Sequence, residues 1–316
     1  MSVGLQKFAG KQLAEWLYVR RVRSFDEMTN ISLKGREALK ANYTIGRHDP
    51  IREAVSVDGT RKYLFEVGEQ FIESVYIPED DRATLCVSTQ AGCKMGCRFC
   101  MTGTLGFHGH LSAADILNQI FYFDDLTNVV FMGEGEPMDN LDNVLRALEI
   151  MTADYGCAWS PKRITVSTVG IPAMKRFLEQ SECHLAVSMH NPFAIERKEI
   201  MQAEKLLSIT DIVALLKQYD WSHQRRVSFE YICWAGQNDT PRHAKELLRL
   251  LKGLPCRINL IRFHAGVDRA FPASDEKQME WFRDYLTDNG ITTTIRKSRG
   301  EDILAACGML VNSLSA

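Results

Sequence analysis

The sequence predicts an α/β fold: a partial barrel of about six βα units, preceded by a small helical module and a β-hairpin extension. From Thr84 onward, short apolar runs alternate with amphipathic stretches of helical length, which is typical of repeated βα units. The length of 316 residues suits one such barrel with an appendage. Hydrophobic residues make up 45% and charged residues 25% of the chain, as in ordinary globular proteins. The pattern favours a partial or full barrel over a two-sided open sheet.

The predicted barrel occupies residues 79–316, and its strands and helices follow one another in turn. The expected strands are 84–89, 128–132, 163–168, 184–189, 227–233, 257–263 and 291–296. The expected helices lie near 112–123, 141–152, 172–180, 208–219, 240–252 and 275–289. Three of these helices follow a residue whose hydroxyl can cap the first turn, namely Ser112, Thr240 and Ser274. In parallel barrels the catalytic groups gather where the strands end, so we expect a site in the loops after these strands.

Two smaller segments precede the barrel. Residues 1–50 read as a helical module, and residues 51–78 change to strand character. The expected helices of the module are Lys11–Arg20 and Gly35–Asn42. The expected strands of the second segment are 63–67 and 71–77, separated by Gly68, as in a β-hairpin.

The overall charge gives no sign of a strongly basic nucleic-acid-binding domain. The formal net charge is -2, so any contact with RNA has to use local patches. The candidate patches are Arg20, Arg21 and Arg23; Lys34, Arg36 and Lys40; Arg225 and Arg226; and Arg296, Lys297 and Arg299. Taken alone, such clusters are more often solvated faces of helices and turns.

Nine cysteines occur in a chain that shows no charged-then-apolar leader after Met1 and no run of eighteen apolar residues. These features predict a cytoplasmic, monomeric protein with no membrane segment. Its cysteines are then expected to be reduced thiols, metal ligands or catalytic groups rather than a disulfide framework. Four scattered cysteines are expected to be inert core thiols: Cys157, Cys183, Cys233 and Cys256.

A CxxxCxxC run follows the first predicted barrel strand and consists of Cys93, Cys97 and Cys100. Three thiolates on one short loop can bind three irons of a [4Fe–4S] cluster and leave the fourth iron open to a small molecule. A structural zinc site is the alternative, with His108 or His110 as fourth ligand, although zinc knuckles normally pair CxxC with another close pair. The position of the loop, and an aromatic residue before its last cysteine, resemble the radical S-adenosylmethionine (SAM) superfamily.

That resemblance implies that SAM binds the open iron and is cleaved to a 5′-deoxyadenosyl radical. The next strand is followed by Gly133-Glu134-Gly135-Glu136-Pro137, which resembles the SAM-binding loop of the superfamily. Gly135 would let the backbone approach the ligand, and Glu136 would receive its ammonium group. The hydroxyls of Ser167 and Ser188 and the imidazole of His190 lie at later strand ends and suit ribose and carboxylate contacts. Met189 belongs to the same segment and is also expected to contact SAM. Without the cluster motif, all of these would be interpreted as turn or capping residues.

Two further cysteines narrow the resemblance. Cys86 lies seven residues before Cys93, and Cys307 follows the stretch Ser298-Arg299-Gly300-Glu301-Asp302-Ile303. Together with Gly59–Tyr63 and Asn259–Ile261, these segments resemble the RlmN/Cfr family of RNA adenine methyltransferases over nearly the whole chain. The resemblance extends to the N-terminal module, which would then assist RNA binding.

The chemistry of that family assigns a role to each of these two cysteines. Cys307 takes a methyl group from one SAM, and a second SAM supplies the radical that activates this methyl group for addition to the base. Two SAM molecules are therefore used per turnover. Cys86 releases the covalent adduct by attacking the sulfur of Cys307, which forms a transient disulfide. The alternative for Cys307 is a core thiol at a helix end.

The resemblance also implies roles for two residues that the sequence alone does not single out. Glu73 corresponds to a proton acceptor of the family, but by itself it is the polar face of a strand. His264 stands where the family often has Asn in a Pro-x-Asn turn, because this chain reads Arg262-Phe263-His264. A histidine ring nitrogen can still hydrogen-bond SAM, so we expect a SAM contact there with altered geometry.

The expected function is methylation of C2 of adenine in 23S rRNA, at the peptidyl-transferase centre, and in tRNA, 3′ of the anticodon. A flavodoxin- or ferredoxin-type protein would donate the electron. A Cfr-type enzyme that methylates C8 of the rRNA adenine has the same cysteines and stays an alternative; the N-terminal module and the Ser298–Ile303 stretch favour C2. A third alternative, from another class, is a non-catalytic RNA-binding protein with a structural metal.

Overall fold

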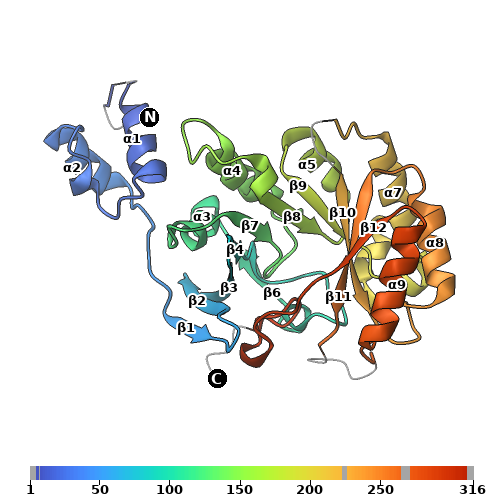
Figure 1. Cartoon of the computed structure of the whole chain (residues 1–316). Coiled ribbons are helices and arrows are strands. Elements are labelled where there is room, and N and C mark those ends of the chain that lie inside the picture. Colours follow the sequence, from blue (N-terminus) through green and yellow to red (C-terminus); the bar gives the residue numbers. More distant parts are fainter. Residues whose placement is uncertain (1–4, 7, 223–225, 265–270, 312–316) are drawn as a thin grey trace.

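The computed structural model describes residues 5–6, 8–222, 226–264 and 271–311. A ten-stranded sheet in the order β1-β2-β3-β4-β7-β8-β9-β10-β11-β12 forms its centre (Figure 1). Seven neighbouring strands of this sheet are parallel, namely β4 (Arg82–Cys86), β7 (Asn128–Phe131), β8 (Ile164–Thr168), β9 (His184–Ser188), β10 (Val227–Cys233), β11 (Cys256–Arg262) and β12 (Thr292–Ile295). The described sheet runs from an edge at β1 to an edge at β12. It is an open, partial barrel, which confirms the predicted fold class.

Helices connect the consecutive parallel strands. They are α3 (Ala113–Phe121), α4 (Leu141–Thr152), α5 (Met174–Gln180), α6 (Ala194–Ile200), α7 (Ile209–Gln218), α8 (Pro241–Leu251) and α9 (Glu276–Asp288), with the 3-10 helices η4 (Pro161–Arg163) and η5 (Gln202–Lys205). The six predicted helices are confirmed. Helix α6 was not predicted. None of the helices in the described ranges is long and apolar enough to cross a lipid bilayer.

The three predicted helix caps have different outcomes. Ser112 caps α3 through its hydroxyl, which accepts a backbone N–H of the first turn, as predicted. Thr240 occupies the cap position of α8 but makes no cap bond, and its hydroxyl instead pairs with the His243 ring at 2.7 Å. For Ser274 the prediction is wrong. Asp275 caps α9, since the chain enters the helix one residue later and a carboxylate accepts the same N–H group equally well.

The predicted hairpin is confirmed and is larger than expected. Three antiparallel strands, β1 (Arg52–Val55), β2 (Arg61–Val67) and β3 (Gln70–Glu79), form an extension of the sheet. Gly68 makes the turn between β2 and β3 with a φ of +61°, a conformation that suits glycine. Because β3 also pairs antiparallel with β4, the extension is continuous with the barrel.

The N-terminal module forms a small core of its own. Its elements are α1 (Ala9–Ala14), the π-helix η1 (Glu15–Val19), the 3-10 helix η2 (Phe25–Glu27) and α2 (Leu33–Asn42). Its buried side chains are Trp16, Val22, Phe25, Met28, Ile31 and Leu39. Two arginines tie the module and its linker to the end of α3, since Arg21 donates to the Phe123 carbonyl and Arg47 to the Phe121 carbonyl, both at 2.7 Å.

The first barrel strand ends earlier than predicted. It stops at Cys86 rather than residue 89, although the Val87 amide still donates to the Val130 carbonyl at 2.9 Å. The chain then enters a separate two-stranded sheet of β5 (Gln90–Gly92) and β6 (Phe107–His110). This small sheet brackets the cluster-motif loop and the 3-10 helix η3 (Met101–Thr104), while a last 3-10 helix, η6 (Glu301–Ile303), lies near the C-terminus.

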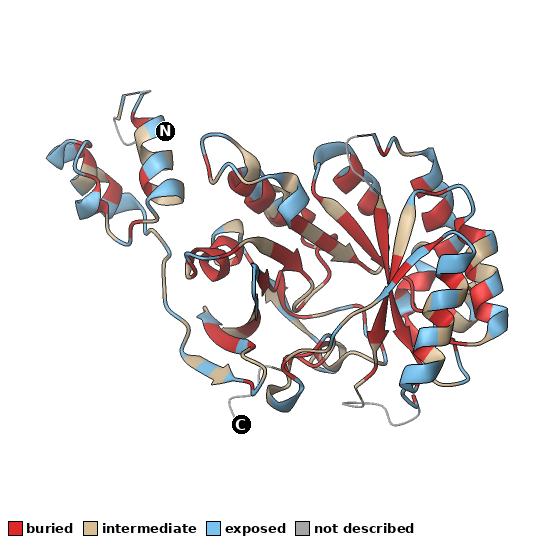
Figure 2. Ribbon diagram, viewed as in Figure 1, coloured by how far each residue is buried: buried red, intermediate tan, exposed pale blue. Residues whose placement is uncertain are grey.

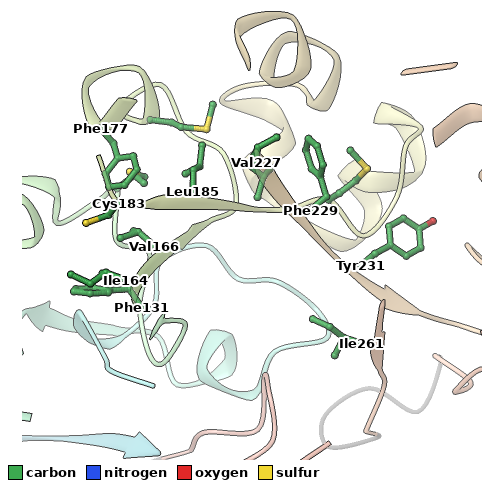
Figure 3. Packing of buried hydrophobic residues seen from close by; sticks show 14 of the residues in the cluster. Phe131, Ile164, Val166, Phe177, Cys183, Leu185, Val227, Phe229, Tyr231 and Ile261 are labelled. Carbon is green, nitrogen blue, oxygen red and sulfur yellow. The ribbon is translucent and has the colours of Figure 1, made fainter. Parts of the chain in front are cut away.

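The main core lies between the sheet and the helices that cover it. Figure 2 shows buried residues concentrated on the strands and on the helix faces turned towards them. Ile164 and Val166 of β8 are buried in this layer, together with Phe177 of α5 and Phe229 of β10 (Figure 3). Side chains alternate along a strand, so the intervening residues, such as Ser167, face the inside of the barrel. This alternation leaves a row of polar side chains available for a site.

Candidate active site

A cavity at the C-terminal ends of the barrel strands brings most of the predicted site together. We call it the cluster cavity. Its lining includes Cys93, Cys97, Cys100, Gly135, Glu136, Ser167, Ser188, His190, Glu230, Arg296 and Cys307. Three predicted site residues lie elsewhere in the described chain and do not line this cavity, namely Glu73, Met189 and His264. Cys86 lies beside it, as described below.

The three motif cysteines sit on a loop fixed at both ends by backbone hydrogen bonds. The Cys93 amide donates to the Gly106 carbonyl at 2.8 Å, and the amide of Met101, directly after Cys100, donates to the Gly308 carbonyl at 2.8 Å. Burial raises the pKa of Cys93 to about 12 and raises the pKa of Cys97 and Cys100 as well. The charge of Cys100 adds to the rise in the pKa of Cys93, and the charges of Cys100 and Cys93 add to the rise in the pKa of Cys97.

The donor set fits an iron–sulfur cluster better than a zinc ion. His108 pairs with the Leu105 carbonyl at 2.9 Å and His110 pairs with Gln90 at 3.1 Å, so neither completes a zinc site. Within the described residues, no three His, Cys, Asp or Glu side chains converge on the position of a single ion. A cluster needs no such convergence, because each thiolate binds a different iron. We therefore find no support for the zinc alternative.

The loop after β7 supplies two buried carboxylates with different surroundings. Glu134 crosslinks the sheet, since its carboxylate accepts the Glu73 amide at 2.7 Å and the Gly92 amide at 3.2 Å. Glu136 faces the cluster cavity and accepts hydrogen bonds from the Thr168 hydroxyl at 2.6 Å and from two backbone amides. Burial raises the pKa of Glu136 to about 7. Glu134 is thus occupied by backbone amides of β3 and β5, whereas Glu136 lines the cluster cavity.

Gly135 is required by the shape of this loop. Its φ is +96°, and a Cβ atom there would lie 2.6 Å from the Gln90 side chain. Gln90 packs so closely because its side-chain carbonyl accepts the Glu136 amide at 2.8 Å. The motif glycine therefore makes room for the residue that orients Glu136. The sequence reasoning missed Gln90, which a single sequence offers no signal to find.

The segment after β9 changes direction at His190. His190 has a φ of +55°, which is uncommon outside glycine, and its Nδ1 accepts the Ile232 amide at 3.1 Å. Burial lowers the pKa of this imidazole to about 3, so the ring is neutral. The Met189 side chain is fully buried in the core, and its amide donates to the Glu230 carbonyl at 3.0 Å. Ser188 and His190 thus face the cavity, while Met189 lies between them and points away.

Cys307 lies on a segment without regular secondary structure apart from η6. We call residues 300–311 the C-terminal segment. It runs back from β12 towards β1 and β2 (Figure 1). It is bound to the cluster loop, since the Gly308 carbonyl accepts the Met101 amide at 2.8 Å and the Leu310 carbonyl accepts the Thr102 hydroxyl at 3.0 Å. These two bonds hold Cys307 at the cavity that the three motif cysteines line.

Cys86 and Cys307 lie near each other although they are 221 positions apart in the sequence. Cys86 is the last residue of β4 and packs with Ala305 and Leu310 of the C-terminal segment. Burial raises the pKa of Cys86 to about 12, and the charge of Cys307 adds to this rise. The positive charge of Arg296 lowers the pKa of both Cys86 and Cys307, so its guanidinium lies close enough to interact with both thiols. All nine cysteines are free thiols in the structure.

Arg296 was predicted as part of a basic patch, yet it belongs to the site. Its guanidinium lies 3.4 Å from the Glu230 carboxylate and 3.6 Å from the Met132 sulfur. Glu230 is a buried carboxylate on β10 that the sequence reasoning missed. The alternation of side chains along 227–233 could have indicated it, because Ser228, Glu230 and Ile232 share one face of β10, and Glu230 and Ile232 line the cluster cavity.

A second cavity adjoins the first, and Cys307 and Arg296 line both. We call it the arginine cavity, because its charged lining is mainly cationic: Arg82, Arg257, Arg262, Arg296, Lys297 and Arg299, with Glu79 and Glu230. His264 lines this cavity, and its Nε2 lies 3.1 Å from Glu301 and also contacts the Ser298 hydroxyl. The sequence reasoning missed Arg82 and Arg257, because they come from different strands and form no run.

The other predicted basic patches are largely paired. Arg20 bonds Glu15 at 2.7 Å, Arg23 bonds Asp49 at 2.6 Å and Lys40 bonds Asp26 at 2.5 Å. Arg21 is committed to the Phe123 carbonyl, and Arg36 donates to the Asp26 carbonyl at 2.7 Å. Lys34 is exposed and Arg226 is half-buried, while Arg225 lies outside the described residues.

Glu73 makes contacts that its predicted role does not require. It lies on β3 and is almost fully buried, with its carboxylate 3.0 Å from the Lys62 ammonium. The same carboxylate accepts the backbone amide of Val311, also at 3.0 Å. Glu73 is thus connected to the C-terminal segment and not to the lining of the cluster cavity.

Comparison with known proteins agrees with this arrangement. Residues 87–251 match the model of the radical SAM superfamily, and residues 1–45 match the model of the ribosomal RNA large subunit methyltransferase N-terminal domain. The chain is 60% identical to the probable dual-specificity RNA methyltransferase RlmN of Bacteroides thetaiotaomicron, over 98% of this chain and 91% of that protein. It is 41% identical to the dual-specificity RNA methyltransferase RlmN of Syntrophus aciditrophicus, with the same two coverages.

A solved structure supports the same assignment. The crystal structure of a radical SAM methyltransferase from Sphaerobacter thermophilus superposes with a TM-score of 0.91 and 34% identity, over 98% of this chain and 94% of that chain. The superfamily match also implies a [4Fe–4S] cluster and SAM as cofactors. The fold, the two matched models and the identities over nearly the full length lead to one conclusion: this chain belongs to the RlmN family of radical SAM RNA methyltransferases.

Proposed function

We propose that this protein methylates C2 of adenine in 23S rRNA, at the peptidyl-transferase centre, and in tRNA, at the adenosine 3′ of the anticodon. The relatives named above are dual-specificity RNA methyltransferases. One observation carries the proposal: Cys307 lines the same cavity as Cys93, Cys97 and Cys100. A thiol at this position can hold a methyl group beside a radical source.

Cys93, Cys97 and Cys100 would hold the cluster, and the residues around them would hold SAM. When bound, the cluster and SAM together supply a 5′-deoxyadenosyl radical. Glu136 would receive the ammonium group of SAM, and the backbone of Gly135, which lines the same cavity, would lie beside it. Ser167, Ser188 and His190 face the same cavity and would contact the rest of SAM. Met189 is held in the core, so the contact proposed for it is restricted to its backbone.

Cys307 would carry the methyl group between SAM and the RNA. Its thiolate takes the methyl group of one SAM as a thioether, and a second SAM is consumed to activate that group, so two SAM molecules serve each turnover. Desolvation raises the pKa of the Cys307 thiol, and the Arg296 guanidinium opposes that rise. Arg296 thereby favours the thiolate that the first step needs.

Cys86 would release the product. After the base has become attached to the methylene carbon on Cys307, the Cys86 thiolate attacks the Cys307 sulfur and displaces the methylated base, which leaves a disulfide between the two cysteines. The proximity of Cys86 to the C-terminal segment supports this step. Before this displacement, the adduct formed by radical addition must lose the C2 proton to a base and one electron, which would return to the cluster held by Cys93, Cys97 and Cys100. The role of that base is the family's prediction for Glu73, and the SAM contact of His264 likewise remains a prediction.

The arginine cavity supports an RNA substrate. It adjoins the cluster cavity at Cys307, and its cations would meet the phosphates that flank an adenine inserted towards Cys307. We propose a monomer that works in the cytoplasm, where these RNAs are found, and that receives its electrons from a flavodoxin- or ferredoxin-type protein.

Nucleoside analysis of the RNA product tests the proposed function. Reconstituted protein is incubated with SAM, a reductant and unmodified 23S rRNA or tRNA, and the digested RNA is separated by chromatography with 2-methyladenosine and 8-methyladenosine as standards. We expect 2-methyladenosine from both RNAs. The C8 isomer would establish the Cfr-type alternative, and unmodified RNA with uncleaved SAM would indicate a non-catalytic RNA-binding protein.

A further inference from the structure

A buried ion pair lies beneath the C-terminal segment. Lys62 of β2 and Glu73 of β3 are 3.0 Å apart, and their side chains are 8% and 2% exposed. Buried charges of this kind are costly unless each is paired and hydrogen-bonded further. Both residues of this pair find their further partners in the C-terminal segment, which gives the pair a second role besides holding the hairpin together.

The two partners lie on either side of Cys307. The Lys62 ammonium donates to the Leu304 carbonyl at 3.4 Å, three residues before Cys307. The Glu73 carboxylate accepts the Val311 amide at 3.0 Å, four residues after it. The segment between these contacts has no regular secondary structure, and Leu304 and Gly308 both have positive φ values, of 54° and 81°. Its path therefore depends on contacts with other parts of the chain.

The hairpin extension makes further bonds to the beginning of the same segment. The Asp58 carboxylate accepts the Gly300 amide at 3.0 Å, and Asp302 accepts the Val57 amide at 3.1 Å. The extension thus hydrogen-bonds to the start of the segment, and the Lys62–Glu73 pair hydrogen-bonds to it on both sides of Cys307. Opposite the extension, the cluster loop binds Gly308.

We propose that Lys62 and Glu73 are positioning residues that hold the C-terminal segment so that Cys307 stays in the cluster cavity. This inference rests on the proposed function, because it assigns the pair to the cysteine that carries the methyl group. It differs from a proton-acceptor role in the step that it affects. A proton acceptor acts only after the base has been attached, whereas positioning of Cys307 is needed before any RNA binds.

Two variants separate these roles. Glu73→Gln keeps an oxygen that can accept the Val311 amide but removes the charge that pairs with Lys62. Lys62→Met removes the bond to Leu304 and leaves any proton-acceptor function of Glu73 in place. The matched control is Glu53→Gln on β1, which loses an exposed ion pair with Arg61, at 3.4 Å, on the same hairpin. The double variant Lys62→Met with Glu73→Gln leaves no unpaired buried charge and serves if a single variant fails to fold.

The first measurement does not depend on activity. Amide hydrogen exchange is followed by mass spectrometry on the intact, cluster-loaded protein, and peptides covering the C-terminal segment are compared with peptides from α7. We expect at least tenfold faster exchange in the C-terminal segment of the Lys62→Met and double variants, with α7 and the Glu53→Gln control unchanged. Unchanged exchange in the C-terminal segment would overturn the proposal. Faster exchange everywhere would overturn it too, because it would show a general loss of stability.

The second measurement is the rate of methyl transfer to Cys307 from SAM in the absence of RNA, read from the mass of the Cys307 peptide. Because small displacements of reacting groups cost about a hundredfold in rate, we expect a decrease of at least tenfold in Lys62→Met and in the double variant, and none in Glu53→Gln. Normal Cys307 methylation in all variants, with a covalent RNA adduct accumulating only where Glu73 is changed, would show that Glu73 is a proton acceptor alone. If even the unmodified protein leaves Cys307 unmethylated, the proposed function fails, while the exchange measurement still decides the positioning role.

Discussion

The carbonyl of Gly308, directly after Cys307, accepts a 2.8 Å hydrogen bond from the amide of Met101, directly after Cys100. One backbone bond thus joins the neighbour of Cys307, the proposed methyl carrier, to the neighbour of the last cysteine of the cluster motif. The two segments are over two hundred residues apart in the sequence. This bond holds the segment that carries Cys307 against the loop that carries the motif cysteines, and a substitution at Gly308 tests its importance.

Replacing Gly308 by alanine should disturb this junction. Gly308 has a φ of +81°, and an L-residue in that conformation costs about 1–2 kcal/mol. We expect Gly308→Ala to lower the initial rate of RNA methylation several-fold while the iron content stays unchanged. Gly10→Ala is the matched control, because Gly10 lies in α1 with no atom within 4 Å of an added Cβ. Equal rates for the two variants would show that the junction does not control activity.

Removing the cation near the two thiols should make Cys307 less reactive. Arg296 opposes the rise of the Cys307 pKa that desolvation causes, so its loss lets that pKa rise further and reduces the thiolate present near neutral pH. We expect Arg296→Met to slow alkylation of Cys307 by iodoacetamide several-fold at pH 8 and to move the pH profile of the reaction upward. Arg296→Lys keeps the positive charge, so its rate of Cys307 alkylation should lie between the rates of Arg296→Met and of the unmodified protein. A profile unchanged in Arg296→Met would contradict this account of the thiol.

The motif cysteines should be needed for iron, whereas the scattered cysteines should not. Cys97→Ala removes one of three thiolates from a buried loop, and we expect the protein to lose most of its iron, its visible absorbance and its ability to cleave SAM. Cys256→Ala is the control, since this half-buried thiol begins β11 at the opposite end of the barrel strands from the motif loop. Iron retained by Cys97→Ala, or lost by Cys256→Ala, would argue against the assigned ligands.

A buried arginine should stabilise the barrel end on which the cavity is built. Arg197 is fully buried, pairs with Glu204 and donates to the carbonyls of Met189, at 3.0 Å, and Val169, at 2.6 Å. Arg197→Met leaves the Glu204 carboxylate buried without its partner, so we expect the free energy of unfolding to fall by about 3–5 kcal/mol in urea titrations. Arg176 is exposed and pairs with Asp142, so Arg176→Met should lower the free energy of unfolding by less than about 1 kcal/mol. Similar losses for the two variants would refute the distinction.

Local patterns in the sequence were sufficient to predict most of the fold and the cluster motif. The strands around Ile164–Thr168 and Val227–Cys233 show apolar runs between turn signals, and a three-cysteine loop is contiguous. The same alternation, applied residue by residue, would also have found Glu230. The cap at Asp275 rather than Ser274 was missed because two neighbouring residues could each cap the helix.

What the sequence could not supply are the contacts between distant segments. The Lys62–Glu73 pair and its bonds to Leu304 and Val311 join three stretches of chain. A periodic pattern within one stretch cannot predict contacts between separate stretches. Met189 shows the related problem of direction. It was grouped with Ser188 and His190, but its side chain lies on the same face as those of Leu185 and Val187 and is buried in the core.

The most direct test of the central claim is to trap the link between Cys307 and RNA. In a Cys86→Ser variant that has SAM, a reductant and substrate RNA, the resolving thiol is missing, so a covalent adduct should accumulate and run as a slower band on a denaturing gel. Peptide mapping should place the attached adenine on Cys307, and Cys307→Ala should form neither adduct nor methylated RNA. Methylated RNA from the Cys307→Ala protein, or turnover by Cys86→Ser without any adduct, would contradict a methyl group carried on Cys307.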